Sequence, residues 1–256
     1  MKKLSILFIL IALFVSACSA PAAEEPEVEV TQLTVLTSPD YPPYESIDAT
    51  GKYVGFDIEL MEAIAAIAGF EVVWKEQSFD GIIAGLQAGQ GDMAISGMNV
   101  NEERKLSVDF SDIYKAGEAL YTAVVLTEKG YATVEDLTGL KIGVQTGTVQ
   151  EAAMNTIAAK YNLTIESRTS FLTIIEDIKL GRLDALVIDY ENATQYSIAN
   201  PELGVFVIED ADIDGDSGTA IAFPKGSEWV AKVNEAIAQL KEDGTLEALD
   251  AKWFAE

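Results

Sequence analysis

Segments with the pattern of buried strands alternate with segments of helical periodicity, and this alternation restricts the possible folds more than any other feature. The run GFDIELMEAIAAIAGF places Ile58, Met61 and Ile64 at helical spacing and ends at Gly69. Strand-like runs at QLTVLTS, EVVWKEQ and DMAISG surround this helix and a shorter helical run, FDGIIAGLQAG. A strand–helix–strand rhythm of this kind predicts a parallel sheet with helices on both faces.

A second series of the same kind follows, so we predict two α/β lobes. Its strand-like runs are LKIGVQTG, LTIES and LDALVID, and its helical runs are TVQEAAMNTIAAKY and FLTIIEDIKLG. The run GTAIAFPKG predicts one further strand, and two terminal helices divided at Gly244 complete the chain. Because open α/β sheets bind ligands at the carboxyl ends of their strands, the crevice between the two lobes is the expected site.

The N-terminus carries the pattern of an export signal. Two lysines precede an apolar run from Leu4 to Val15, which is shorter than the about 20 residues of a membrane-spanning helix. The sequence VSAC that follows resembles the bacterial lipobox, in which the cysteine is lipidated, so Cys18 is the predicted lipidation site. We predict a signal peptide over residues 1–17 and a lipidated, flexible tether over residues 18–30. The exported protein would be anchored to the cell membrane, facing the periplasm or the cell exterior.

The composition argues against several classes of function. The chain has 42 acidic and 17 basic residues, and its formal charge of −25 disfavours charge-driven binding to nucleic acid or to an anionic membrane. It has no histidine, which excludes histidine-dependent catalysis and histidine–metal sites, and its single cysteine excludes an intrachain disulfide. Neither a Rossmann nor a P-loop glycine motif occurs. We therefore predict no metal and no cofactor.

Four residues suggest a site for a small charged ligand. Arg104, one of only three arginines, lies where a strand is predicted to end and a helix to begin. A guanidinium there could bind a carboxylate through two hydrogen bonds, although a surface arginine paired with a neighbouring acid is the simpler interpretation. In the second series, VQTGTVQEA would present free N–H groups at Thr148 and Val149 to an anion. Asp189 ends the strand LDALVID, where its carboxylate could receive an ammonium group or cap the next helix.

Together these groups would form a clamp for a zwitterion. The arginine and the helix N-terminus would bind its carboxylate, and the aspartate would bind its ammonium group. The stretches PDYPPY and QSFDG add aromatic rings at Tyr41 and Phe79 that could enclose an aliphatic chain. Taken singly, each ring is more often a core residue than part of a ligand site. The combination predicts a small zwitterionic ligand.

Four stretches that carry these residues resemble the polar amino acid-binding proteins of bacterial ABC importers: TSPDYPPYESIDATGKYVGFDIELMEAIA, SFDGIIAGLQAGQGDMAISGMNVNEERKLSVDFS, KIGVQTGTVQE and GRLDALVIDYENA. The resemblance runs in consistent order from about Leu33 to the C-terminus. It implies an α/β fold of the type II periplasmic-binding-protein class, with two lobes, each a mixed sheet flanked by helices, joined by two crossover strands. The crossovers would fall near residues 114–121 and 211–220. Lobe 1 would contain residues 31–117 and 216–256, and lobe 2 residues 118–215.

The resemblance also implies which residues form the two halves of the clamp. Arg104 would bind the α-carboxylate of the ligand together with the amide of Thr148. Asp189 would bind the α-ammonium together with the carbonyl of Gly97 and the side chain of Asn99. Family members usually have threonine or serine at position 99.

Four further residues would surround the side chain of the ligand. By the resemblance, Tyr41 and Phe79 would flank this side chain, and Ser38 and Gln145 would lie at its distal end. Position 38 is often acidic in relatives that take cationic side chains, so a serine there favours a neutral polar ligand such as glutamine. The predicted substrate-binding residues are Ser38, Tyr41, Phe79, Ser96, Gly97, Asn99, Arg104, Gln145, Thr148, Val149 and Asp189.

The resemblance thus implies a monomeric solute-binding lipoprotein that delivers an amino acid to the permease of an ABC transporter and is not an enzyme. Two other functions stay open. A cyclohexadienyl dehydratase-like enzyme on the same scaffold would need a carboxyl group with a raised pKa as general acid, for which Asp189, Asp40 and Glu45 are available. A lipoprotein that senses the ligand for a membrane receptor would share all the features described above.

Overall fold

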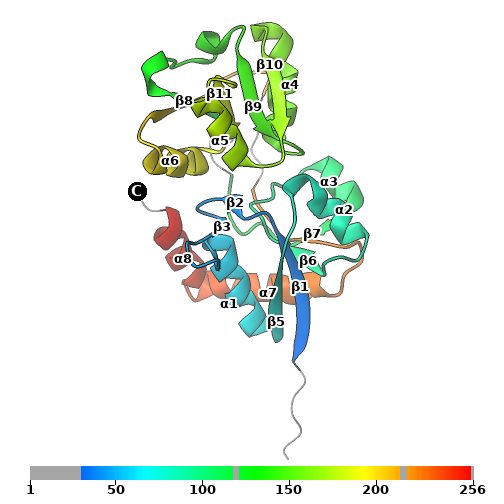
Figure 1. The fold of residues 1–256 in the computed structure, drawn as a ribbon. Coiled ribbons are helices and arrows are strands. Elements are labelled where there is room, and N and C mark those ends of the chain that lie inside the picture. The colour runs from blue at the N-terminus through cyan, green and yellow to red at the C-terminus, as the bar shows by residue number, and fades with distance from the viewer. Residues whose placement is uncertain (1–29, 118–120, 214–217, 255–256) are drawn as a thin grey trace, which may run out of the picture.

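The computed structural model describes residues 30–117, 121–213 and 218–254. Two α/β lobes follow one another along the long axis of the molecule (Figure 1). The sheet of the first lobe has the strand order β5-β1-β6-β13-β7, and the sheet of the second has the order β10-β9-β11-β8-β12. The two-lobed α/β fold predicted from the sequence is confirmed.

The sheet of the first lobe is mixed. β1 pairs in parallel with β5 and β6, whereas β13 pairs antiparallel with β6 and β7. The strand–helix rhythm alone predicts a parallel sheet, and this prediction is wrong for the first lobe. The mixed sheet implied by the family resemblance is confirmed, because β13 comes from a distant part of the chain and pairs antiparallel with its neighbours. The strands are β1 (Thr31–Thr37), β5 (Phe70–Glu76), β6 (Met93–Ala94), β7 (Asp109–Phe110) and β13 (Ala222–Phe223).

Helices cover both faces of this first sheet. Met61 and Ile64 of the predicted helix are fully buried in a cluster shared with β1, β5 and the two C-terminal helices. This helix ends at Gly69, whose φ of 79° is accessible to glycine at little cost. The helices are α1 (Phe56–Ala68), α2 (Ile82–Gln87), α3 (Glu102–Ser107), α7 (Trp229–Glu242) and α8 (Thr245–Phe254), with a 3-10 turn η1 (Phe79–Gly81) before α2.

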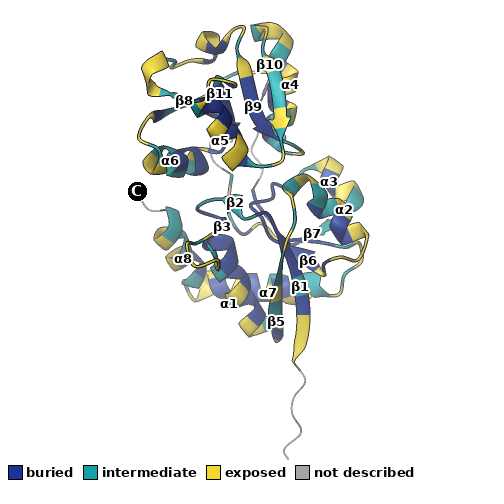
Figure 2. Ribbon diagram, viewed as in Figure 1, coloured by how far each residue is buried: buried dark blue, intermediate teal, exposed yellow. Residues whose placement is uncertain are grey.

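The second lobe has the same layered construction, with buried central strands (Figure 2). Alternate residues of its strands pack against α4 on one face and against α5 and α6 on the other. Its strands are β8 (Thr122–Leu126), β9 (Lys141–Gln145), β10 (Thr164–Arg168), β11 (Ala185–Ile188) and β12 (Leu203–Val207). Its helices are α4 (Val149–Tyr161), α5 (Phe171–Lys179) and α6 (Tyr190–Ala199), with 3-10 turns η2 (Thr127–Lys129) and η3 (Val134–Leu137).

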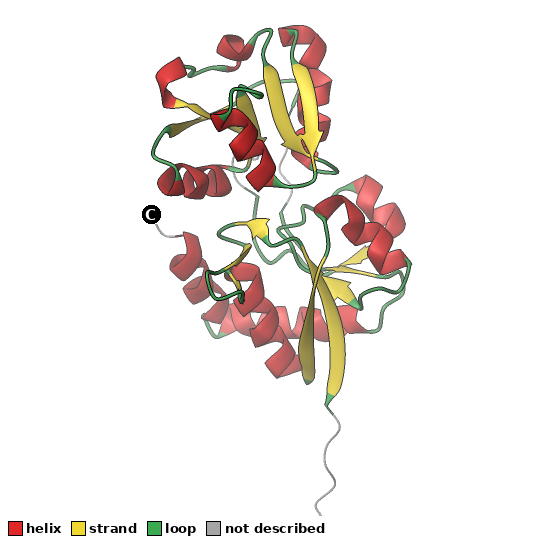
Figure 3. Ribbon diagram, viewed as in Figure 1, coloured by secondary structure: helices red, strands yellow, loops and turns green. Residues whose placement is uncertain are grey.

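A small antiparallel sheet lies on the side of the first lobe that faces the second (Figure 3). Its strands are β2 (Asp40–Tyr41), β3 (Glu45–Ile47) and β4 (Tyr53–Val54). The sequence predicts only a proline-rich loop here, because strands of two or three residues leave no periodic pattern. This sheet brings residues 40–45 to the junction of the lobes.

The predicted crossovers are only partly within the described ranges, since residues 118–120 and 214–217 lie outside them. Their described flanks lie side by side, because Lys115 and Thr219 form an antiparallel bridge. The predicted signal peptide, Cys18 and all of the tether but its last residue also lie outside the described residues. Within the described ranges, the helices are too short or too polar to cross a membrane.

Candidate functional site

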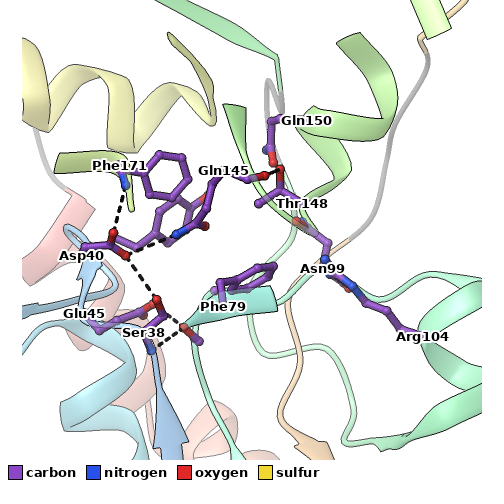
Figure 4. A pocket seen from close by; sticks show the side chains of 13 residues that line it. Ser38, Asp40, Glu45, Phe79, Asn99, Arg104, Gln145, Thr148, Gln150 and Phe171 are labelled. Atoms are coloured by element: carbon purple, nitrogen blue, oxygen red, sulfur yellow. Dashed lines mark hydrogen bonds between the residues drawn. The ribbon is translucent and has the colours of Figure 1, made fainter. Parts of the chain in front are cut away.

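A narrow cavity lies between the lobes at the carboxyl ends of β1, β6 and β9, where an α/β sheet is expected to bind ligands. Its volume is about 10 Å³, roughly the minimum for a single water molecule. An amino acid would therefore enter only if the lobes moved apart. The cavity is lined by Ser38, Asp40, Tyr41, Glu45, Phe79, Ser96, Gly97, Asn99, Arg104, Gln145, Thr148, Gln150 and Phe171 (Figure 4).

Arg104 supplies a buried cation at one end of this cavity. The first turn of α3 positions it, since the Asn101 side chain caps the helix by accepting from the Arg104 N–H at 2.8 Å. Arg104 is 7% exposed as a whole residue. Its guanidinium donates to the carbonyls of Asn99 at 2.6 Å and Gly147 at 2.9 Å, and lies 5.2 Å from the ring centroid of Phe79. No ion pair within the described residues involves Arg104, so the simpler interpretation as a surface ion pair is wrong.

The charge of Arg104 persists at neutral pH. Burial lowers the pKa of Arg104, but only to about 10. A buried cation whose hydrogen-bond partners are neutral carbonyls is costly to desolvate, and it gains most from an anionic partner. The geometry therefore favours a carboxylate ligand at this end of the cavity.

Asp40 supplies an acidic group at the opposite end (Figure 4). Its carboxylate accepts hydrogen bonds from the Phe171 N–H at 2.9 Å, the Ser38 hydroxyl at 3.3 Å and the Gln145 amide at 3.5 Å. The Ser170 side chain also hydrogen-bonds to Asp40, and burial raises the pKa of Asp40 despite these four donors, all of which are neutral. The sequence suggests Asp40 only as a possible general acid. Its place in the stretch PDYPPY is the local signal that could have assigned it to the binding site.

Asp189 is buried behind the cavity and does not line it. Its carboxylate accepts a hydrogen bond from the Gln150 amide at 3.1 Å, and Gln150 itself lines the cavity. The side chain of Asp189 makes no capping hydrogen bond to α6, so the helix-cap alternative is wrong. Burial and the neighbouring charge of Glu191 hold the pKa of Asp189 well above its usual value. A contact between Asp189 and the ligand stays a prediction.

The N-terminus of α4 separates the cavity from an open groove. Thr148 caps this helix, because its hydroxyl accepts from the Glu151 N–H at 3.1 Å and donates to the Gln145 carbonyl at 2.7 Å. Thr148 and Arg104 line both the cavity and the groove, which has a volume of about 650 Å³. Val149 lines only the groove, so of the two predicted anion-binding residues Thr148 alone reaches the cavity.

Aromatic rings form one wall of the cavity. Tyr41 stacks on both Tyr44 and Phe171, with ring centroids 5.4 Å apart in each pair. Phe171 begins α5, about 130 residues after Tyr41 in the chain, so nothing local in the sequence indicates this contact. Apart from Val149 and Asp189, all the predicted substrate-binding residues line the cavity. The cavity residues absent from that prediction are Asp40, Glu45, Gln150 and Phe171.

Comparison with known proteins gives a consistent assignment. Residues 33–256 match the family model of bacterial extracellular solute-binding proteins, family 3. The chain is 37% identical over 223 residues to the arginine-binding extracellular protein ArtP of Bacillus subtilis (strain 168), covering 87% of this chain and 86% of that protein.

Two solved structures are similar over nearly the same region. One is the substrate-binding protein of an amino acid ABC transporter, with a TM-score of 0.82 and 33% identity over 88% of this chain and 100% of that one. The other is an ancestral arginine-binding protein bound to glutamine, with a TM-score of 0.79 and 40% identity over 88% of this chain and 98% of that one. The chain therefore belongs to family 3 of the bacterial extracellular solute-binding proteins, within the amino acid-binding proteins of ABC transporters.

Proposed function

We propose that this protein binds a free amino acid between its lobes and delivers it to the permease of an ABC transporter. The observation that carries the proposal is Arg104, a buried guanidinium at an inter-lobe cavity whose hydrogen-bond partners are neutral carbonyls. An α-carboxylate would supply the missing negative charge through a bidentate hydrogen-bonded pair. The amide of Thr148, at the N-terminus of α4, would add a further donor.

In this proposal the α-ammonium binds Asp189, the Gly97 carbonyl and the Asn99 side chain. The Asp189 carboxylate is occupied by Gln150 in the present arrangement of the lobes. Ligand binding would therefore require the Gln150 amide to move aside or to share the carboxylate. The ammonium charge would then favour the ionised form of Asp189, which burial otherwise disfavours.

Two chemical classes of ligand side chain fit the distal end. Ser38 and Gln145 favour a neutral polar side chain such as that of glutamine, and one similar ancestral protein is bound to glutamine. Asp40 favours a cationic side chain instead, because its hydrogen-bond donors carry no charge. The similarity to an arginine-binding protein supports this second class. We keep glutamine as the first candidate and a cationic amino acid as the second.

Thermal unfolding of the purified protein, refolded to remove bound ligand, against each of the twenty amino acids tests the proposal. A ligand at a thousand-fold excess over its Kd stabilises the folded state by about 4 kcal/mol, which raises the melting temperature by several degrees. We expect a shift with glutamine, or with arginine, lysine or histidine if Asp40 sets the specificity. If none of the twenty amino acids raised the melting temperature, the proposal would fail.

A dehydratase is the alternative function from another class. Two carboxyl groups that line the cavity, those of Asp40 and Glu45, have pKa values raised by burial, as a general acid requires. Incubation of the purified protein with a cyclohexadienol acid, followed by ultraviolet detection of an aromatic product, distinguishes the two functions. Turnover that is lost in the Glu45→Gln and Asp40→Asn variants would favour the enzyme.

We also propose that the chain is exported with residues 1–17 as signal peptide, and that it is anchored through lipidated Cys18. Replacing Cys18 with serine should move the protein from the membrane fraction to the soluble exported fraction, because a stable anchor requires the acyl chains. Intact-mass measurement of the membrane-bound protein should show removal of residues 1–17 and the added mass of the lipid. A Cys18→Ser protein that stayed in the membrane fraction would contradict the anchor.

A further inference from the structure

Two buried carboxyl groups lie in contact beside the binding cavity. Glu45 and Asp57 are both fully buried, and Glu45 also lines the cavity. Their side chains are close enough to hydrogen-bond to each other once one of them carries a proton. The second oxygens, Glu45 Oε2 and Asp57 Oδ1, have no other hydrogen-bond partner within the described residues. A single proton between the two groups would satisfy both oxygens.

The other oxygens of the pair indicate which group holds the proton. Asp57 Oδ2 accepts two hydrogen bonds, from the Gly97 N–H at 2.7 Å and the Tyr114 hydroxyl at 2.9 Å. Glu45 Oε1 accepts one, from the Ser96 hydroxyl at 2.7 Å. Because hydrogen bonds to a carboxylate stabilise its charged form, Asp57 is the carboxylate and Glu45 is the acid.

The surrounding charges favour the same assignment. Burial, followed by the negative charges of Asp57 and Asp40, holds the pKa of Glu45 well above its usual value. Two ionised carboxylates in contact at a buried site would repel each other strongly. The titratable groups around the pair are Asp40, Tyr44, Tyr114 and Tyr196, with Glu191 and Asp250 farther away and paired with Lys115.

The pair is connected directly to the segment that carries much of the predicted binding site. Ser96 and Gly97 follow β6 and line the cavity, and each donates a hydrogen bond to one member of the pair. The Ser96 hydroxyl also accepts a hydrogen bond from the Ser38 N–H at 3.1 Å. The pair thus holds Ser96 and the backbone of Gly97 in place, and through Ser96 it also holds the backbone of Ser38.

We propose that Glu45 and Asp57 share one proton, with Glu45 as the acid, and that Glu45 is a positioning residue that holds Ser96 and Gly97 for amino acid binding. The second part of this inference rests on the proposed function. The first part concerns the ligand-free protein, so it can be tested whatever the ligand is.

The pH dependence of unfolding without ligand tests the shared proton. Glu45 keeps its proton in the folded protein but loses it on unfolding above its ordinary pKa, so the stability that Glu45 provides falls as the pH rises. Burial raises the pKa of Asp57 to about 6, so Asp57 is the carboxylate only above that pH. Between pH 7 and 8, unfolding of the wild type should release about one proton more per molecule than unfolding of Glu45→Gln. The matched control is Glu62→Gln, an exposed residue on the same helix as Asp57, which should keep the wild-type slope. A wild-type slope in Glu45→Gln would overturn the shared proton.

A comparison of Glu45→Gln with Asp57→Asn tests which of the two carboxyl groups carries the proton. Glutamine can replace the acid as donor to Asp57, so this variant should fold and bind the amino acid identified by thermal unfolding within about threefold of the wild type. In Asp57→Asn, an amide oxygen replaces the carboxylate oxygen that accepts two hydrogen bonds, and an amide oxygen is the weaker acceptor. Glu45→Ala removes the group that donates the proton to Asp57. Both should weaken binding by tenfold or more. If Asp57→Asn were tolerated and Glu45→Gln failed to fold or to bind, the assignment would be reversed and the proposal wrong.

The two proposals fail in distinguishable ways. If the wild type bound none of the twenty amino acids, the proposed function would fail, while the ligand-free pH slope would still decide whether the proton is shared. If the wild type bound an amino acid and Glu45→Ala bound it equally well, the positioning role would fail and the proposed function would stand.

Discussion

At the scale of single residues, the site separates one buried cation, Arg104, from a partly buried acid, Asp40. Arg104 has only neutral hydrogen-bond partners at one end of the cavity, and so does Asp40 at the other. Each group is poorly compensated in the low-dielectric space between the lobes, so each is stabilised by a ligand charge of opposite sign. In the proposed binding mode, the α-carboxylate of the ligand would lie toward Arg104 and its side chain toward Asp40.

Replacing Arg104 with methionine should weaken amino acid binding by about 30- to 4,000-fold. This range follows from the roughly 2–5 kcal/mol lost when one partner of a buried charge pair is truncated, at about 1.4 kcal/mol per tenfold change in Kd. Titration calorimetry with the amino acid identified by thermal unfolding measures the change. The control is Arg182→Met, whose side chain is 67% exposed and pairs with Asp177 away from the cavity. A loss of less than about tenfold in Arg104→Met would contradict the assigned role.

The Asp189 carboxyl should make binding weaker at lower pH. Its raised pKa means that the ligand-free protein holds a proton there over a pH range where an ordinary aspartate is ionised. An ammonium group binds the ionised form, so binding releases this proton, and the Kd rises by up to tenfold for each unit that the pH falls below that pKa. Calorimetry from pH 8 to pH 5, in buffers of different ionisation enthalpy, counts the released protons. A Kd independent of pH would argue against contact between Asp189 and the ammonium.

At the scale of elements, the start of α1 controls where the buried Asp57 lies. Gly55 directly precedes α1 with a φ of 139°, a conformation that few side chains tolerate, and the Tyr44 carbonyl occupies the space that a Cβ at this position would need. The close approach brings β3 against α1, and hence Glu45 against Asp57. A glycine is therefore required at this position for both conformational and steric reasons.

Replacing Gly55 with alanine should destabilise the protein by about 2–5 kcal/mol, which combines backbone strain with overpacking. The matched control is Gly51→Ala, because Gly51 also has a positive φ, 85°, but has no atom within 4 Å of an added Cβ. The control should lose only about 1–2 kcal/mol. Urea unfolding of both variants measures the difference. Equal losses would show that the Tyr44 carbonyl does not restrict position 55.

At the scale of the whole molecule, the lobes are held together by a small number of direct contacts. Within the described residues, the polar contacts across the cleft include Arg104 to the Gly147 carbonyl, the Phe171 N–H and the Gln145 amide to Asp40, the Asn192 amide to the Pro42 carbonyl, the Tyr196 hydroxyl to the Asp40 carbonyl, and the ion pair of Lys115 with Glu191. The Tyr41 and Phe171 rings also stack across it. Few contacts of modest strength permit opening, and a ligand that bridges the lobes would stabilise the closed form by its differential affinity.

Removing the hydroxyl of Tyr196 should shift the ligand-free protein toward the open form. Tyr196 donates to the Asp40 carbonyl at 2.7 Å without lining the cavity, so Tyr196→Phe tests closure and leaves the ligand contacts intact. One neutral hydrogen bond contributes about 0.5–1.5 kcal/mol, which corresponds to a loss of affinity of about 2- to 10-fold. Small-angle X-ray scattering without ligand should show a larger radius of gyration, which ligand reverses.

The control for this variant is Tyr161→Phe. The Tyr161 hydroxyl donates to Asp210 at 2.6 Å within the second lobe, so its removal should change neither the radius of gyration nor the affinity. Equal effects of the two substitutions, or no effect of either, would mean that Tyr196 does not contribute to closure.

The sequence by itself determined the features that depend on local pattern. The helical spacing of Ile58, Met61 and Ile64, with the stop at Gly69, correctly predicted α1 and its buried face. The position of Arg104 at a strand-to-helix junction correctly placed it near the cavity. Such features are encoded within a few turns or strand residues, because hydrophobic periodicity and the start and stop residues of helices act over short distances.

Only the tertiary structure decided how distant segments complete the site. The small sheet of residues 40–54, the contact of Asp40 with Phe171 and the contact of Glu45 with Asp57 carry no local pattern. The burial that raises the pKa values of these carboxyl groups also arises only when the two lobes and the small sheet pack together. Local residue order sets which elements form, whereas the charges and partners of the site depend on contacts between residues far apart in the chain, which the fold alone brings together.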